Sequence, residues 1–253
     1  MTGLTEDKIV LVTGSGGGIG RAAAELFAAE GAVVVGADVD LDGGAQTVDS
    51  ITGAGGQATF VAADLTDEVQ VEALVRGIIA EHGRLDAAFN NAGINDESRP
   101  FTELDQRDWD RMIAVNLTSV FLCMKHELAH MAERGQGAIV NTSSGAGLTP
   151  APGMPHYTAA KHGVLGLTKA ASAEFAGQGI RVNAVLPGMT RTPMIEGWFE
   201  SNPEIAKYVL RSLPGGKLGE PEQVARAAVW LCSDQADWVG GVSLVVDGGG
   251  LNH

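Results

Sequence analysis

Short apolar runs of strand length alternate with longer amphipathic stretches along nearly the whole chain. Most of these runs are continuously apolar rather than alternating in polarity, which is typical of strands covered on both faces of a parallel sheet. Seven such runs occur, at residues 9–12, 33–37, 58–62, 85–89, 138–141, 181–186 and 243–246. This alternation predicts strands and helices wound around one parallel sheet.

The stretches between the runs have the length and polarity of surface helices. We expect these helices to begin near Gly18, Leu41, Asp67, Gln106, His156 and Pro221. The fold class is therefore α/β, a doubly wound, seven-stranded parallel sheet flanked by helices, in a single domain over residues 1–253. Residues 189–216 break the rhythm, and we expect there a small substrate lid, built as a loop with one or two short helices.

A glycine-rich sequence, TGSGGGIG at residues 13–20, joins the first predicted strand to the first predicted helix. Glycines permit a tight turn and a close approach of the backbone to a pyrophosphate, and a helix N-terminus favours its negative charge. The spacing departs from the common G-x-G-x-x-G, because the sixth position counted from Gly14 is Ile19. An ordinary tight turn is the alternative, but the strand before it and the helix after it favour a dinucleotide site.

An acidic cluster follows the second predicted strand. Asp38 lies 18 residues beyond Gly20, and an acidic residue near this position can accept hydrogen bonds from an adenosine ribose. Residues 36–42 contain Asp38, Asp40 and Asp42 but no lysine or arginine. A 2′-phosphate would meet three carboxylates with no counter-charge, which favours NAD over NADP. Three solvated loop aspartates are the alternative interpretation.

Tyr157 and Lys161 lie four residues apart at a predicted helix start, which puts both side chains on one helical face. A tyrosine titrates near ~10 in isolation, too high for acid–base chemistry at neutral pH. A nearby ammonium group favours the phenolate and is expected to lower the Tyr157 pKa. The pair alone is weak evidence, because most such spacings are surface coincidences.

Three motifs appear together in the chain, TGxxxGxG at 13–20, NNAG at 90–93 and YxxxK at 157–161. With the matches at Asp64–Leu65, Asn116, Ser143–Ser144, Pro187–Gly188 and residues 246–249, they cover nearly the whole chain. The motifs occur in the same order as in the short-chain dehydrogenase/reductase family, and the chain resembles an NAD-preferring member of that family. The resemblance implies a single-domain Rossmann fold and an oxidoreductase.

The resemblance also implies the catalytic roles. Tyr157 is the general acid/base, and Lys161 lowers its pKa and binds the nicotinamide ribose. Ser144, rather than its neighbour Ser143, holds the reacting oxygen, and Asn116 holds a water molecule in the proton relay. The expected reaction is a hydride transfer between NAD(H) and a secondary alcohol or its ketone.

Cofactor and substrate contacts are carried over in the same way. The expected cofactor-binding residues are Gly14, Gly17, Gly18, Ile19, Gly20, Asp38, Asp64, Leu65, Asn91, Ala92, Gly93, Tyr157, Lys161, Pro187, Gly188, Met189 and Thr192. Met189 departs from the β-branched residue that is commoner in the family. The expected substrate-pocket residues are Ile94, Asn95, Ala146, Met154, Met194 and Trp198. Because most of these are apolar, we expect an apolar or alicyclic substrate.

Three competing interpretations remain. The first is an NADPH-linked 3-oxoacyl-type reductase, which the acidic cluster disfavours. The second is a zinc hydrolase that uses the HExxH sequence formed by His126, Glu127 and His130. The apolar stripe of this helix is formed by Leu117, Val120, Phe121, Met124, Leu128 and Met131. Both histidines fall on the opposite, polar side, where we expect solvated or subunit-interface residues. The third is a non-catalytic dinucleotide sensor, which would need a broken catalytic set. No metal site is expected.

Net charge and the lack of targeting signals limit the classes of partner and the location that we expect. With 17 basic and 31 acidic residues, the net charge of −14 disfavours nucleic acid and anionic membranes. No signal peptide and no long apolar run is evident, and Cys123 and Cys232 are expected to be buried, reduced thiols. We therefore expect a cytoplasmic enzyme with a small-molecule substrate. The family resemblance adds a homotetramer paired through the long helices after Gln106 and His156.

Overall fold

The computed structural model describes residues 3–252, so residues 1, 2 and 253 of the expected domain lie outside the described part. Seven parallel strands form one sheet in the order β3-β2-β1-β4-β5-β6-β7. The strands are β1 (Ile9–Thr13), β2 (Val33–Asp38), β3 (Gln57–Ala62), β4 (Ala87–Asn90), β5 (Gly137–Thr142), β6 (Ile180–Pro187) and β7 (Ser243–Val246). The expected doubly wound, seven-stranded Rossmann fold is confirmed, and all seven apolar runs are strands.

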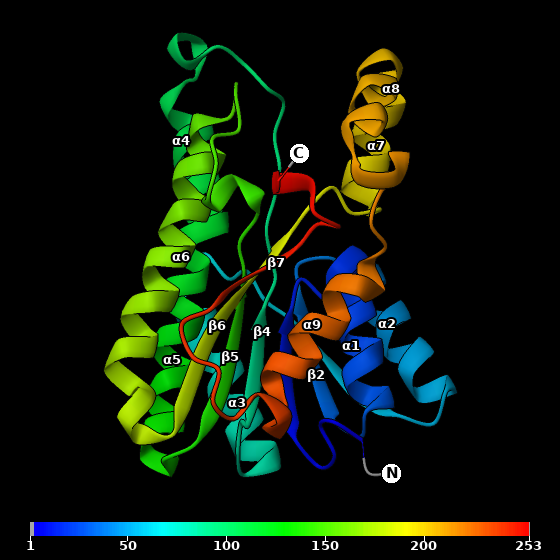
Figure 1. Ribbon diagram of the computed structural model, residues 1–253. Helices are drawn as coiled ribbons and strands as arrows, with labels where there is room; N and C mark the ends of the chain where they lie inside the picture. The colour runs from blue at the N-terminus through cyan, green and yellow to red at the C-terminus, as the bar shows by residue number, and fades with distance from the viewer. Residues whose placement is uncertain (1–2, 253) are drawn as a thin grey trace.

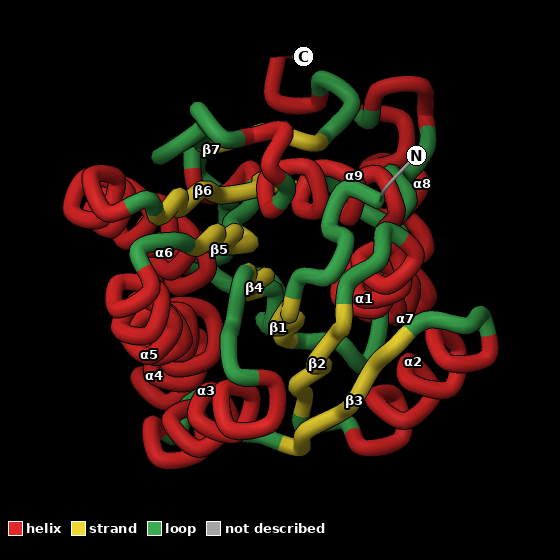
Figure 2. The backbone as a smooth tube through the Cα atoms, turned by 90° about the horizontal axis from the view of Figure 1, so that it is seen from below, coloured by secondary structure: helices red, strands yellow, loops and turns green. Residues whose placement is uncertain are grey.

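Helices cover both faces of the sheet, which is why the strands are apolar without alternation. Figure 2 shows α3, α5 and α6 on one face and α1, α2 and α9 on the other. Their bounds are α1 Gly18–Ala29, α2 Leu41–Gly53, α3 Glu68–His82, α4 Gln106–Ile113, α5 Ser119–Arg134, α6 Pro155–Phe175 and α9 Pro221–Cys232. Within residues 3–252, none of the helices combines the length and hydropathy that crossing a membrane requires.

The expected helix beginning near Gln106 is interrupted. α4 ends at Ile113, one π-helical turn covers Ala114–Thr118, and α5 continues from Ser119. Single π-helical turns inside helices are frequent at functional sites. The turn contains the fully buried Asn116, an expected catalytic residue.

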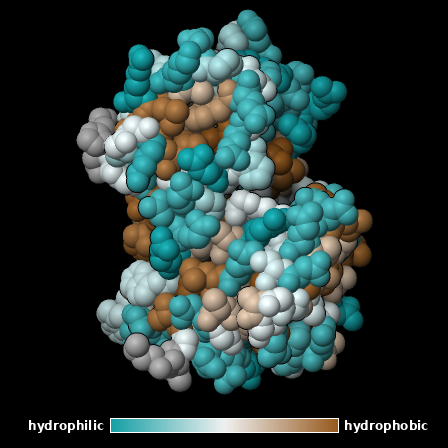
Figure 3. All heavy atoms as spheres, turned by 90° about the vertical axis from the view of Figure 1, so that its right-hand side faces the viewer, coloured by the Kyte–Doolittle hydropathy of each residue, from teal (hydrophilic) through white to brown (hydrophobic). Residues whose placement is uncertain are grey.

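Two short helices follow β6 within residues 189–216, α7 (Pro193–Ser201) and α8 (Pro203–Ser212). Both begin with proline, whose missing N–H is harmless in a first turn. Figure 1 shows them standing beyond the carboxyl end of the sheet, and Figure 3 shows this side of the molecule narrowing below them. They lie on the side of the sheet where a ligand of this fold is expected.

Glu127 of α5, the glutamate of the HExxH sequence, lies in the core. Its side chain is fully buried, whereas Phe121, assigned to the apolar stripe, is 48% exposed. Asn90 of β4 donates from Nδ2 to Glu127 Oε2 at 3.0 Å, and Glu127 Oε1 finds no partner within residues 3–252. Burial disfavours the carboxylate and raises the pKa of Glu127 to about 7.

This burial predicts that the protein loses stability as pH rises. The Glu127 pKa is about 7 in the folded chain and about 4.5 when unfolded, so the folded chain holds this proton more tightly. The free energy of unfolding is therefore highest below pH 4.5 and falls as the pH rises toward 7. Glu127→Gln stays neutral at all pH values. In urea unfolding, the free energy of unfolding of Glu127→Gln relative to that of the wild type should therefore rise by about 2–3 kcal/mol between pH 5 and 8.

The exposed Glu133 of the same helix provides a matched control. Glu133→Gln should follow the wild-type pH profile. A Glu127→Gln protein whose stability difference from the wild type does not change with pH would contradict the assignment of a raised pKa.

Candidate functional site

Polar groups from three strands meet at the carboxyl edge of the sheet. Thr13, which ends β1, accepts from the Asn91 N–H through Oγ1 at 2.9 Å and from Asn91 Nδ2 through its carbonyl at 3.2 Å. Thr142, which ends β5, donates from Oγ1 to Asn91 Oδ1 at 3.4 Å. These bonds hold the glycine-rich turn, the NNAG segment and the end of β5 side by side.

The glycine-rich turn leaves room for a bound anion. Gly14 has a left-handed φ of 68°, and a Cβ at Gly20 would overlap the Gly14 carbonyl oxygen. A Cβ at Gly17 would have no neighbouring atom within 4 Å. Because no side chain caps the N-terminus of α1, its first N–H groups are available to a ligand. The turn therefore fits a dinucleotide pyrophosphate.

Asp38 ends β2 directly beside this turn. Its carboxylate accepts from the Gly16 N–H at 2.8 Å and from the Asp40 N–H at 3.0 Å. The structure adds a cation near this turn that residues 36–42 do not contain. Arg21 of α1 donates to the carbonyls of Gly16 at 2.8 Å and Gly43 at 3.2 Å. Arg21 comes from the first turn of α1 and faces the start of α2. The sequence around Asp38 therefore does not reveal this cation.

Other expected cofactor contacts lie around the same edge. Thr192 at the start of α7 packs against Gly18, where its Cγ2 would lie 3.0 Å from an added Cβ. Asp64 is exposed and accepts from the Thr66 N–H at 2.9 Å. The Leu65 side chain is buried in the core, so only its backbone can face a ligand. Ile19, Ala92, Pro187, Gly188 and Met189 are partly exposed around the edge.

Lys161 is buried beneath the NNAG segment. Its Nζ donates to the Thr142 carbonyl at 3.1 Å, and burial lowers its pKa to about 8. Asn116 clamps the neighbouring backbone, because Oδ1 accepts from the Ile94 N–H at 3.2 Å and Nδ2 donates to the Ile94 carbonyl at 3.1 Å. A Cβ at Gly93 would lie 2.7 Å from Asn116 Oδ1 and 3.5 Å from Lys161 Nζ. The structure therefore brings these three residues together.

Tyr157 lies one helical turn before Lys161 on α6, with the Lys161 Nζ 5.6 Å from its ring centroid. A hydrogen bond with the Ser144 hydroxyl lowers the Tyr157 pKa, but burial is the larger effect and raises it. The expectation that Lys161 lowers this pKa is not met in the free protein. Because Lys161 is itself desolvated, its charged form is disfavoured as well.

The two adjacent serines have different surroundings. Ser143 is buried and donates from Oγ to the Lys161 carbonyl at 2.8 Å. Ser144 is only partly buried, and its Oγ accepts from the Ala146 N–H at 3.2 Å. Ser144 is therefore the more exposed of the two serines, and its hydroxyl lies next to Tyr157.

The expected substrate-pocket residues differ in their exposure to solvent. Ile94, Asn95, Ala146, Met154 and Trp198 are partly buried, and Met194 is exposed. Asn95 Oδ1 is buried without a hydrogen-bond partner in residues 3–252. Trp198 stacks at a tilt on Phe199, with 5.4 Å between ring centroids.

The HExxH residues do not converge. His130 Nε2 accepts from the Leu85 N–H at 3.2 Å, His126 Nε2 lies 3.6 Å from Glu68 Oε1, and Glu127 points into the core. His130 is therefore hydrogen-bonded within the chain, whereas the buried His126 Nε2 has no hydrogen-bond partner in residues 3–252. In the described part of the chain, no three His, Cys, Asp or Glu side chains are placed to hold a metal ion.

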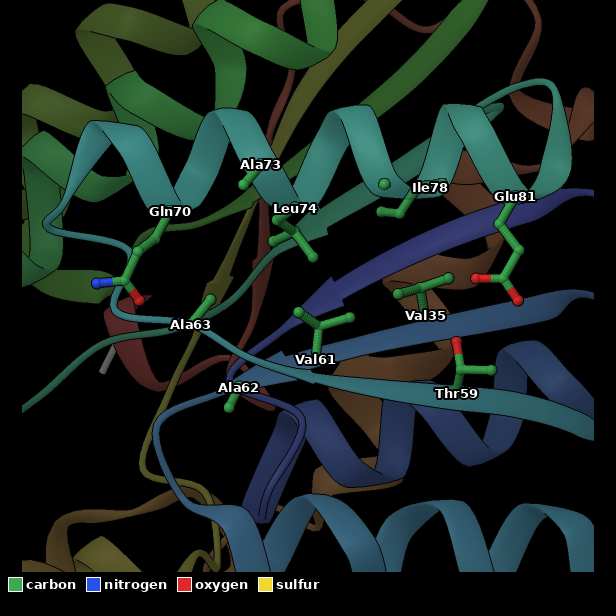
Figure 4. A pocket seen from close by; sticks show the side chains of 11 residues that line it. Val35, Thr59, Val61, Ala62, Ala63, Gln70, Ala73, Leu74, Ile78 and Glu81 are labelled. Atoms are coloured by element: carbon green, nitrogen blue, oxygen red, sulfur yellow. The ribbon is translucent and has the colours of Figure 1, made fainter.

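A separate groove runs between α3 and strands β2 and β3 (Figure 4). Val35, Val61 and Leu74 form its middle, and Gln70 and Glu81 stand at its two ends. Ser144, Tyr157 and Lys161 are not among its lining residues. It is therefore distinct from the polar edge of the sheet.

The comparison with known proteins agrees with the site. A family model described as Enoyl-(Acyl carrier protein) reductase matches residues 14–250. The 2,5-dichloro-2,5-cyclohexadiene-1,4-diol dehydrogenase of Sphingobium indicum is 42% identical, over 96% of each chain. The cyclohexanol dehydrogenase of an Acinetobacter species is also 42% identical, over 98% of this chain and 96% of the relative. The chain therefore belongs to the short-chain dehydrogenase/reductase family, oxidoreductases that act on CH–OH groups.

Further relatives widen the range of activities. The 3-oxoacyl-[acyl-carrier-protein] reductase of Thermotoga maritima is 38% identical, over 96% of this chain and 98% of the relative. The crystal structure of levodione reductase superposes with a TM-score of 0.94 at 36% identity, covering 98% of both chains. A structure from Beutenbergia cavernae, described with bound NADP at low occupancy, has a TM-score of 0.92 at 34% identity and covers 98% of both chains.

Two glycines in the turn provide a test of the anion site. Gly17→Ala should unfold like the wild type, because its Cβ meets open space, but should weaken NADH binding by occupying that space. Gly20→Ala should lose both NADH binding and about 1–3 kcal/mol of stability, because its Cβ overlaps the Gly14 carbonyl. Fluorescence titration with NADH and urea unfolding measure the two effects.

Gly53→Ala, also with open space around its Cβ but away from the turn, is the control and should leave NADH binding unchanged. If Gly17→Ala bound NADH as tightly as the wild type, the pyrophosphate would not lie on this turn.

Proposed function

We propose that this chain transfers a hydride between NAD(H) and a secondary alcohol or its ketone, with an apolar or alicyclic substrate. The observation that carries the proposal is the meeting of Ser144, Tyr157, Lys161 and Asn116 at the carboxyl edge, directly beside the glycine-rich turn. When bound, the nicotinamide supplies a hydride acceptor or donor. A sensor without catalysis would not need this complete set of residues.

The chain's own groups would handle the proton. Tyr157 would take the hydroxyl proton of the alcohol, and the Ser144 hydroxyl would hold the same oxygen as it becomes a carbonyl. Lys161, fixed by the Thr142 carbonyl, would supply positive charge behind the Tyr157 ring. Asn116 would hold a water molecule in the proton relay, as the family resemblance implies. Reduction of a ketone uses the same groups in reverse.

The choice of NAD over NADP rests on the ribose end of the site. Asp38 is fixed beside the glycine-rich turn by two backbone amides, and Asp40 and Asp42 follow it. Arg21 is the nearby cation, but its NH2 group is already bonded to the Gly16 and Gly43 carbonyls. A 2′-phosphate would therefore face more negative than available positive charge. This also disfavours the NADPH-linked 3-oxoacyl reductase alternative.

The substrate class rests on the apolar residues around Ser144. Met154, Met194, Trp198 and Ile94 offer hydrocarbon surface rather than charge. Relatives named for cyclohexanol and for a chlorinated cyclohexadienediol support a ring-shaped alcohol. A panel of cyclic, acyclic and sugar alcohols with NAD, followed at the nicotinamide absorbance, tests this assignment. Turnover confined to sugar alcohols would contradict it.

We also propose a cytoplasmic homotetramer, again on family resemblance. The partly exposed Trp109 of α4 and Phe121 of α5 give this surface an apolar character that pairing between subunits would cover. Cys123 and Cys232 are both free and buried, so neither is available for cross-linking. A light-scattering mass of four chains of 26.1 kDa is the expected result.

Tyr157→Phe keeps the ring but removes the proton-transferring hydroxyl. We expect its kcat for cyclohexanol oxidation to fall by about 10²–10⁴-fold, the usual contribution of a positioned acid or base. NADH binding should change far less. The control is Tyr208→Phe, because Tyr208 is the other tyrosine of the chain and is 75% exposed. Full activity in Tyr157→Phe would refute the assignment of the acid/base.

Cofactor preference is tested by titrating the wild type with NADH and NADPH. We expect NADH to bind at least about tenfold more tightly, equivalent to ~1.4 kcal/mol. Asp38→Asn should narrow this difference, whereas Asp49→Asn, on the exposed side of α2, should not. Tighter binding of NADPH by the wild type would overturn the proposal for NAD.

A further inference from the structure

The chain end forms a compact turn over residues 247–251, here called the C-terminal turn. Asp247 ties it together, because its Oδ1 accepts from the Gly249 N–H and its Oδ2 from the Leu251 N–H, both at 2.7 Å. Gly248 and Gly249 adopt left-handed φ values of 66° and 93°. With both carboxylate oxygens used, Asp247 acts as a clip that fixes where Leu251 lies.

The C-terminal turn rests on two segments of the proposed site. An added Cβ at Gly188, just after β6, would lie 2.7 Å from Asp247 Cβ, so the turn lies directly on this backbone. Pro214, which follows α8, lies against the other side, 3.8 Å from an added Cβ at Gly248. In Figure 1 the red C-terminal turn lies between the α4–α6 side of the molecule and the α7–α8 pair.

Leu251 reaches from this turn to the residue that follows Ser144. Its Cδ2 would lie 3.3 Å, and its Cγ 3.7 Å, from an added Cβ at Gly145. The Leu251 side chain is only partly buried, so part of its hydrocarbon surface remains free. An apolar side chain is thus held beside Gly145, the residue that follows Ser144, on a turn that rests against Gly188 and Pro214.

From these contacts we infer that Leu251 is a specificity-determining residue, which forms one apolar wall of the alcohol site and limits the size of ring substituents. The inference rests on the proposed function, because it assigns a substrate contact. Leu251 would act by excluding volume, and Asp247 would act as a positioning residue through the two hydrogen bonds of the clip.

Two substitutions at position 251 should move selectivity in opposite directions. The substrates are cyclohexanol and 4-ethylcyclohexanol, with NAD at saturation. Leu251→Ala should raise the ratio of kcat/KM for the ethyl compound over cyclohexanol by about 5–50-fold, since a methylene in an apolar pocket changes rates by roughly this much. Leu251→Phe should lower the same ratio. Asp247→Asn, which weakens the clip, should shift the ratio as Leu251→Ala does.

Three measurements separate this effect from damage to the protein. NADH affinity and the thermal midpoint should stay at wild-type values in both Leu251 variants, and Val69→Ala, 74% exposed on α3, should leave the ratio unchanged. If the wild type is active but the ratio stays within twofold in both Leu251 variants, Leu251 does not line the site. If the wild type oxidises neither alcohol nor any other in the panel, the proposed function fails, and this inference fails with it.

Discussion

A line of hydrogen bonds across the carboxyl edge of the sheet holds the whole site together. It runs from Thr13 to Asn91, from Asn91 to Thr142, and from the Thr142 carbonyl to the Lys161 ammonium group. The line exists because β1, β4 and β5 are parallel neighbours in one register. A one-residue slip would turn these side chains to the other face, and the glycine-rich turn and Lys161 would lose their common support.

Burial then sets the chemistry of this edge. It lowers the Lys161 pKa to about 8 and raises the Tyr157 pKa, so both groups are driven toward their neutral forms in the free protein. The hydrogen bond from Ser144 works against this effect at Tyr157. The C-terminal turn lies against Gly188 at the end of β6, and its Leu251 lies beside Gly145. The proposed acid–base residues and the proposed apolar wall are therefore adjacent but separate groups.

Local patterns predicted the strands and the glycine-rich turn because those features are encoded in consecutive residues. Contacts between distant segments could not be predicted in this way. Glu127 lies at a core position seven residues after Val120, and the apolar stripe expected for this helix did not include it. Asn90, 37 residues earlier in the chain, gives its carboxyl group a hydrogen-bond partner. Arg21 beside the start of α2 and Leu251 beside Gly145 were missed for the same reason.

The central claim is that this edge carries out a direct hydride transfer from an alcohol carbon to NAD. The most direct measurement uses cyclohexanol deuterated at the carbinol carbon, with mass spectrometry of the reduced cofactor. The account predicts one deuterium in the nicotinamide for each cyclohexanone formed. A folded protein that binds NADH but forms no labelled cofactor, while Tyr157 and Lys161 are intact, would contradict it.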